Sequence, residues 1–183
     1  MTFPDAHDAL TERLLEIRTV LVSGPITPDG ATRVAAMLLT LDAEGPAPVT
    51  VRLNSPGGDL GAALMLADSV DLMRAPVHLT CLGEVGGAAL AVLTAAAHRS
   101  AAPGCRFHLV EPKAEPDLSG RTAGELAQLA EAHDTAVERL AWRIAQLTHR
   151  SPADIRADLA PPGRILDAVE AEEYGLVEAP DAA

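Results

Sequence analysis

Aromatic residues are the scarcest feature of this 183-residue sequence, since Phe, Tyr and Trp together make up 2% of it. So few aromatic side chains leave little for stacking on nucleic-acid bases. Basic residues are also in deficit, because 14 Lys and Arg stand against 26 Asp and Glu, a net charge of −12. Phosphate backbones are bound by basic patches, so we expect protein partners and no nucleic acid.

Cysteines and long apolar runs are scarce as well. We interpret the two cysteines, Cys81 and Cys105, as small buried apolar residues rather than a disulfide or a metal site. We predict neither a metal ion nor a cofactor. The opening residues, MTFPDAHDALTERLL, lack the regions of a signal peptide, and no window reaches the roughly 18 unbroken apolar residues of a membrane span. These absences predict a cytoplasmic protein without a membrane partner.

A regular alternation of strand and helix is what the sequence does contain. With 48% hydrophobic residues, the chain fits one domain with a sizeable core. Runs rich in β-branched residues predict strands at 19–26, 48–54, 76–83 and 105–112, and helical spacing predicts a helix after each of the first three. This order is typical of right-handed βαβ crossovers, so the expected fold class is α/β with a largely parallel sheet.

One long helix is predicted from residue 122 to 148. Apolar residues recur along it at alternating spacings of four and three, at Leu126, Ala130, Val137, Leu140, Ile144 and Leu147. His133 is the polar member of this seam, and we interpret it as a half-exposed histidine without a functional role. A long helix with its own apolar seam packs on something else, and in a domain this small that predicts another subunit.

Four segments, taken in order, resemble one known family: RLNSPGGD at 52–59, CLGEVGGAALAVLTAAA at 81–97, RFHLVEP at 106–112 and RILDAVEAEEYGLVEAP at 164–180. Over residues 12–179 the chain resembles the proteolytic subunit of the Clp protease, a caseinolytic serine peptidase (the ClpP family). The resemblance implies an N-terminal segment at 1–10 and one crotonase-like domain at 11–180, with the long helix as a protruding handle. It also implies heptameric rings stacked in pairs around a degradation chamber.

The family's Ser-His-Asp triad is missing from the matching positions. Its serine lies in a motif of the form G-x-A-A-S-M, which places Gly87 at the nucleophile when laid on GEVGGA. The family histidine corresponds to Val110 in RFHLVEP, and the aspartate that precedes an arginine corresponds to Gly163, just before Arg164. Peptide hydrolysis by this route needs a hydroxyl or thiol, a base and an orienting group, and these three residues supply none.

The backbone half of the family site is expected to persist. The two N–H groups that form the family's oxyanion hole correspond to Gly58 and Ala88. A hole without a nucleophile can stabilise charge but cannot attack a peptide. The hypothesis is therefore a catalytically inactive, structural or regulatory Clp-type subunit in a homo- or hetero-oligomer. An active paralogue would supply the triad, and a Clp ATPase unfoldase is a candidate partner.

A hydrolase with a relocated site is the first alternative. It would draw on Ser55 or His108, with the nearby acids Asp59 and Glu84. Each has a simpler structural interpretation, because a serine in SPGG supports the turn and a strand histidine needs only a hydrogen bond. Cys81, at the end of a strand, is most simply a core residue.

A crotonase-like acyl-CoA thioester enzyme is the second alternative. Gly86, Gly87, Leu90 and Ala91 fit the GGxxLA arrangement with which enoyl-CoA hydratases form part of an oxyanion hole. The catalytic acid of those enzymes would fall at Ala89, so this likeness rests on the fold rather than on the site.

Overall fold

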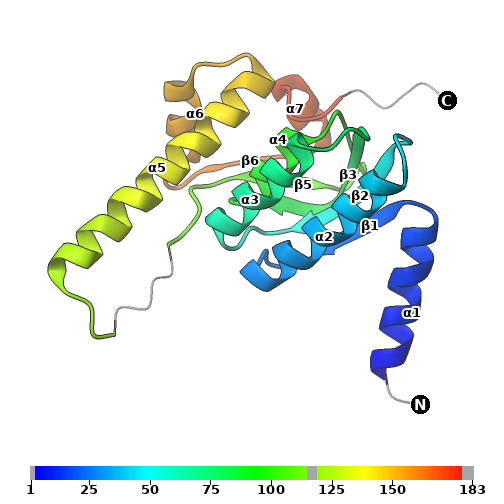
Figure 1. Cartoon of the computed structure of the whole chain (residues 1–183). Helices are drawn as coiled ribbons and strands as arrows, with labels where there is room; N and C mark the ends of the chain where they lie inside the picture. The colour runs from blue at the N-terminus through cyan, green and yellow to red at the C-terminus, as the bar shows by residue number, and fades with distance from the viewer. Residues whose placement is uncertain (1–2, 115–118, 179–183) are drawn as a thin grey trace.

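The computed structural model describes residues 3–114 and 119–178 (Figure 1). Strands and helices alternate along these residues, which confirms the predicted α/β class. The helices are α1 (Phe3–Glu16), α2 (Pro28–Glu44), α3 (Leu60–Asp71), α4 (Ala89–Ala95), α5 (Ala123–Thr148), α6 (Pro152–Leu159) and α7 (Ala168–Tyr174). The strands are β1 (Thr19–Ser23), β2 (Val49–Ser55), β3 (Val77–Gly86), β4 (His98–Ala101), β5 (Arg106–Leu109) and β6 (Arg164–Leu166).

The sheet is mostly parallel, as predicted, with strand order β1-β2-β3-β5-β6 and β4 beside β3. β3 is the central strand, with β2 along one edge and two strands, β4 and β5, sharing the other. Its first part, from His78 to Cys81, pairs with β4, and its last part, from Glu84 to Gly86, pairs with β5. β6 then pairs with β5 in the antiparallel direction. The end of β3 is thereby held close to β5 and β6, which are distant from it in the sequence.

Three parts of this architecture differ from the sequence prediction. The strand predicted to end at Gly83 continues to Gly86, because pairing with β5 outweighs the weak strand propensity of Gly83 and Gly86. The alanine-rich run was expected to be helical from residue 85, and its helix begins only at Ala89. Strands β4 and β6 and helix α7 are short elements that the sequence pattern did not predict.

Small side chains set the packing of helices on the sheet. Every second residue of β2 points inward, so Val49, Val51 and Leu53 are buried while the residues between them are not. Ala63 and Ala67 of α3 are fully buried, and α3 packs closely on α4 through such residues. The core therefore reaches close packing with aliphatic side chains, in keeping with the low aromatic content.

The predicted long helix is α5, and only its second half packs against the body of the domain. A capping box between Thr122 and Glu125 fixes its start. Val137, Leu140 and Ile144 of the seam are buried, Leu126 and Leu147 are half-buried, and Ala130 is exposed. The first half projects away from the sheet, as Figure 1 shows.

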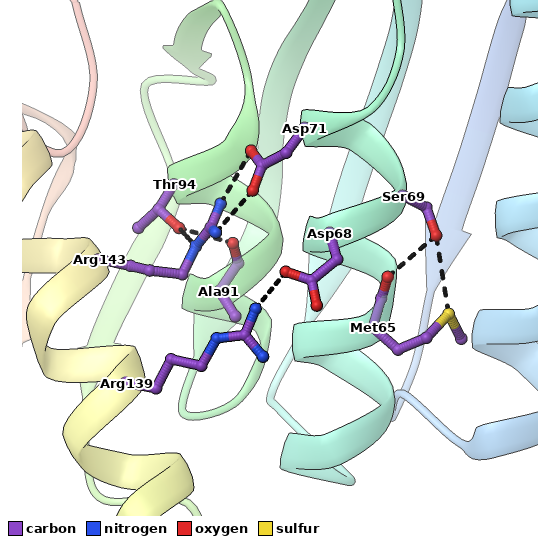
Figure 2. Close-up of polar contacts among 8 residues, drawn as sticks. All are labelled: Met65, Asp68, Ser69, Asp71, Ala91, Thr94, Arg139 and Arg143. Atoms are coloured by element: carbon purple, nitrogen blue, oxygen red, sulfur yellow. Dashed lines mark hydrogen bonds and ion pairs between the residues drawn. The ribbon is translucent and has the colours of Figure 1, made fainter.

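Two arginines of α5 fasten the helix to the body (Figure 2). The Arg143 guanidinium donates to both carboxylate oxygens of Asp71, at 2.7 and 3.1 Å, and its Nε donates to Thr94 Oγ1 at 2.9 Å. One turn earlier, Arg139 pairs with Asp68. The two arginines are four residues apart on α5 and the two aspartates are three apart on α3, so each pair lies on one face of its helix.

His133 has a structural partner that the sequence did not reveal. Its Nε2 lies 3.0 Å from the backbone oxygen of Pro112. The imidazole thus links α5 to the segment that follows β5.

Candidate active site

The positions of Gly87, Val110 and Gly163 come together at one point of the structure. Gly87 follows β3, Val110 follows β5 and Gly163 precedes β6, and these three strands are neighbours in the sheet. A Cβ atom built on Gly87 would lie 3.9 Å from Val110 Cγ2, and one built on Gly163 would lie 2.6 Å from Val110 Cγ1. The side chains present here are therefore aliphatic or absent, and no proton donor or acceptor is supplied by them.

Gly87 has the backbone conformation of a tight turn between strand and helix. Its φ angle is +48°, and its N–H donates to the backbone oxygen of His108 at 3.1 Å. The three nearest atoms to a Cβ built there lie 3.7 to 3.9 Å away, which is ordinary van der Waals contact. The turn thus has space for a side chain and lacks one.

The turn at Gly57 and Gly58 lies against the turn at Gly87. A Cβ atom built on Gly57 would lie 3.5 Å from the backbone nitrogen of Ala88. Gly58 has φ +125°, and a Cβ atom there would lie 2.3 Å from the backbone oxygen of Ile26, so only glycine fits. Within the part of the chain that the structure describes, the N–H groups of Gly58 and Ala88 donate to no other residue.

Ser55 is fully buried, and its hydroxyl is used by the turn itself. Ser55 Oγ donates to the backbone oxygen of Gly57 at 3.0 Å and accepts from the Gly57 N–H at 3.3 Å. A nucleophile needs an accessible oxygen and a base beside it. The geometry therefore favours the turn-supporting interpretation of Ser55.

His108 and the two nearby acids do not form a relay with a hydroxyl group. His108 Nε2 lies 3.8 Å from Glu84 Oε2, and both side chains are partly exposed. Asp59 is the N-cap of α3, where its carboxylate accepts from the Ala62 N–H at 2.7 Å. His108 and Glu84 are thus neighbours on paired strands, and Asp59 has a structural role.

Both cysteines are buried and free, as the sequence predicted. Burial raises the pKa of the Cys105 thiol to about 11. Burial and the neighbouring Cys105 raise the pKa of the Cys81 thiol as well. Thiolate is the reactive form of cysteine, so neither residue is an available nucleophile at neutral pH.

Residues 3–114 and 119–178 contain neither a cluster suited to a metal ion nor a helix suited to spanning a membrane. No group of three or more His, Cys, Asp or Glu side chains there is arranged to hold a metal ion. None of the helices in this part of the chain combines the length and the apolar character that a bilayer crossing requires.

Comparisons with known proteins match this chain over most of its length. The family model described as Clp protease matches residues 5–179. An ATP-dependent Clp protease proteolytic subunit-like protein of Streptomyces coelicolor is 34% identical over 169 residues, which cover 91% of this chain and 79% of that protein. The ATP-dependent Clp protease proteolytic subunit 3 of Nocardia farcinica is 29% identical over 173 residues, covering 91% of this chain and 76% of that protein. The chain therefore belongs to the Clp protease family.

Proposed function

We propose that this chain is a catalytically inactive Clp-type proteolytic subunit with a structural or regulatory role in a ring-shaped, ATP-dependent protease assembly. The observation that carries the proposal is the meeting of Gly87, Val110 and Gly163 at one point, where the family's triad would lie. Acyl transfer from a peptide needs a nucleophile and a base in contact, and this point offers neither. Loss of a triad costs several orders of magnitude in rate.

The retained parts of the fold support a role in assembly. The Gly58 and Ala88 N–H groups keep the position proposed for an oxyanion hole, although no side chain can deliver a nucleophile to it. The handle helix α5 is firmly held by Arg143 and projects its first half away from the body. A chain that keeps its core and its projecting helix can occupy a place in a ring while an active paralogue performs the hydrolysis.

The relocated hydrolase receives little support from the site. The Ser55 hydroxyl is buried in its own turn, and His108 faces Glu84 rather than a hydroxyl group. A fluorophosphonate probe distinguishes the two ideas, because it labels a reactive serine and leaves an inactive subunit unmodified.

Purification of the chain alone, and together with a catalytically active Clp proteolytic subunit, tests the proposal. We expect no hydrolysis of a fluorogenic peptide by the chain alone and its incorporation into a ring, measured by native mass spectrometry. Addition of a Clp ATPase to the mixed ring then shows whether this subunit alters docking. Substantial hydrolysis by the isolated chain, blocked by the fluorophosphonate, would refute the proposal.

A further inference from the structure

Trp142 lies beside a cavity of about 410 Å³ where α3, α4 and α5 meet. It is the single tryptophan of a chain with 2% aromatic residues, and it is 55% exposed. The cavity is lined by Asp71, Thr94, Trp142, Arg143, Gln146 and Leu147. Tryptophan is enriched among the residues that carry most of the binding energy at protein interfaces. An uncovered indole ring beside a cavity therefore marks a candidate binding surface.

A fixed network of polar side chains forms part of the cavity wall. Arg143 donates to both carboxylate oxygens of Asp71 and, through Nε, to Thr94 Oγ1, as Figure 2 shows. Arg143 is the cation among the lining residues, and Asp71 neutralises it. An anionic ligand would therefore meet no free positive charge in the lining. A purely apolar ligand would take water from the partly exposed carboxylate of Asp71 without replacing it, which is unfavourable.

Trp142 is flanked on its own face of α5 by an acid and an amide. Glu138 lies four residues before it and Gln146 four residues after it, so the three side chains share one face of the helix, and all are exposed. Glu138 forms no ion pair with a side chain among the residues that the structure describes, unlike Asp71, which is paired with Arg143. Cations are attracted to the face of an indole ring and to a carboxylate. A guanidinium group suits this surface best, because it can stack on Trp142 while donating to Glu138 and Gln146.

We propose that this surface binds an arginine side chain presented by a segment of a partner protein. The guanidinium group stacks on the Trp142 ring and donates to the Glu138 carboxylate, and an apolar neighbour of that arginine enters the cavity. The net charge of −12 on this chain also favours a basic partner. The surface is independent of the proposed inactivity, because it shares no residue with the site at Gly87, Val110 and Gly163.

Intrinsic fluorescence tests the proposal, because Trp142 is the single tryptophan and reports binding directly. The ligand is a short peptide, blocked at both ends, with one arginine between two leucines. We expect a saturable change in emission below about 1 mM peptide. The same peptide with citrulline in place of arginine keeps the shape and loses the charge, so it should bind at least about five-fold more weakly. Equal affinity for the two peptides, or no saturable binding of the arginine peptide, would overturn the proposal.

Fluorescence anisotropy with a labelled form of the arginine peptide separates the role of the indole ring from that of apolar contact. Trp142→Leu should weaken binding at least about ten-fold, whereas Trp142→Phe keeps an aromatic face and should stay within about five-fold of the wild type. Equal losses in the two Trp142 variants would overturn stacking of the guanidinium group on the ring.

The same measurement tests the carboxylate. Glu138→Gln should weaken binding about three-fold. Glu12→Gln is the matched control, since Glu12 is an exposed glutamate of α1, which lies far from α5 in Figure 1, and it should change affinity less than about 1.5-fold. Equal affinities for these two variants would overturn the pairing with Glu138. Loss of self-association in Trp142→Leu, measured by native mass spectrometry, would overturn the whole proposal, because the surface would then face a second copy of this chain.

Discussion

The Val110 side chain occupies the space in which a side chain at Gly163 would begin. A Cβ atom at Gly163 would lie 2.6 Å from Val110 Cγ1 and 2.7 Å from the backbone oxygen of Leu109. Gly163 also has φ +78°, a left-handed conformation that residues with a Cβ atom adopt at a cost. The backbone conformation and the close contacts at position 163 therefore disfavour any residue with a Cβ atom, aspartate included.

Gly163→Ala should destabilise the fold by about 1–3 kcal/mol, because the new Cβ atom meets both a side chain and a carbonyl oxygen. Urea unfolding measures the loss. Gly104→Ala is the control, since a Cβ atom there would meet nothing within 4 Å, and it should cost less than about 0.5 kcal/mol. Equal stabilities for the two variants would contradict the contact. Adding Val110→Ala to Gly163→Ala should recover part of the loss, because Cγ1 is removed while the Leu109 oxygen remains.

Gly87→Ser combined with Val110→His should create a hydroxyl that a fluorophosphonate labels. Gly87 has room for a Cβ atom, and the φ of +48° costs only about 1–2 kcal/mol for a serine. We expect slow labelling, because Gly163 still supplies no group to orient the histidine. Gly87→Ser alone and Gly104→Ser should stay unlabelled. An unlabelled double variant with native circular dichroism would show that positions 87 and 110 do not meet in reactive geometry.

Arg143→Ala should weaken the attachment of α5 more than Arg139→Ala does. The Arg143 side chain is 11% exposed and makes three hydrogen bonds, whereas the Arg139 side chain is 48% exposed. We expect a loss of about 1–3 kcal/mol for Arg143→Ala and less than about 1 kcal/mol for Arg139→Ala. A double-mutant cycle with Asp71→Asn isolates the pair energy. Additive effects in the cycle would mean that the ion pair contributes nothing.

Asp42→Asn should reduce the sensitivity of the fold to acid. Hydrogen bonds from the N–H groups of Ala75 and Arg74, with the Arg74 charge, hold the pKa of Asp42 below its ordinary value. A lowered pKa contributes stability above the ordinary value, and this stability is lost as the pH falls through that value toward the folded-state pKa. Asparagine can still accept both N–H groups but does not titrate. The urea concentration at the midpoint of unfolding should fall less between about pH 6 and about pH 3 in Asp42→Asn than in the wild type. An unchanged difference would contradict a contribution from Asp42.

The periodic parts of the chain could be predicted from sequence because each depends on local pattern. The alternation of β-branched runs and helical spacing predicted the α/β class, and the apolar seam predicted α5. The short strands β4 and β6 could not be predicted in this way. His98–Ala101 and Arg164–Leu166 have little strand signal of their own, and they are strands because β3 and β5 lie beside them.

The sequence by itself determined which residues stand at the site: glycine, valine and glycine carry no hydroxyl, imidazole or carboxylate in any fold. Only the tertiary structure decided that these three positions meet, that Ser55 is buried in its turn, and that Val110 fills the space beside Gly163. The physical reason is that side-chain chemistry is local, whereas these contacts join residues far apart in the chain. Strand pairing from β3 through β5 to β6 brings them within a few ångströms of each other.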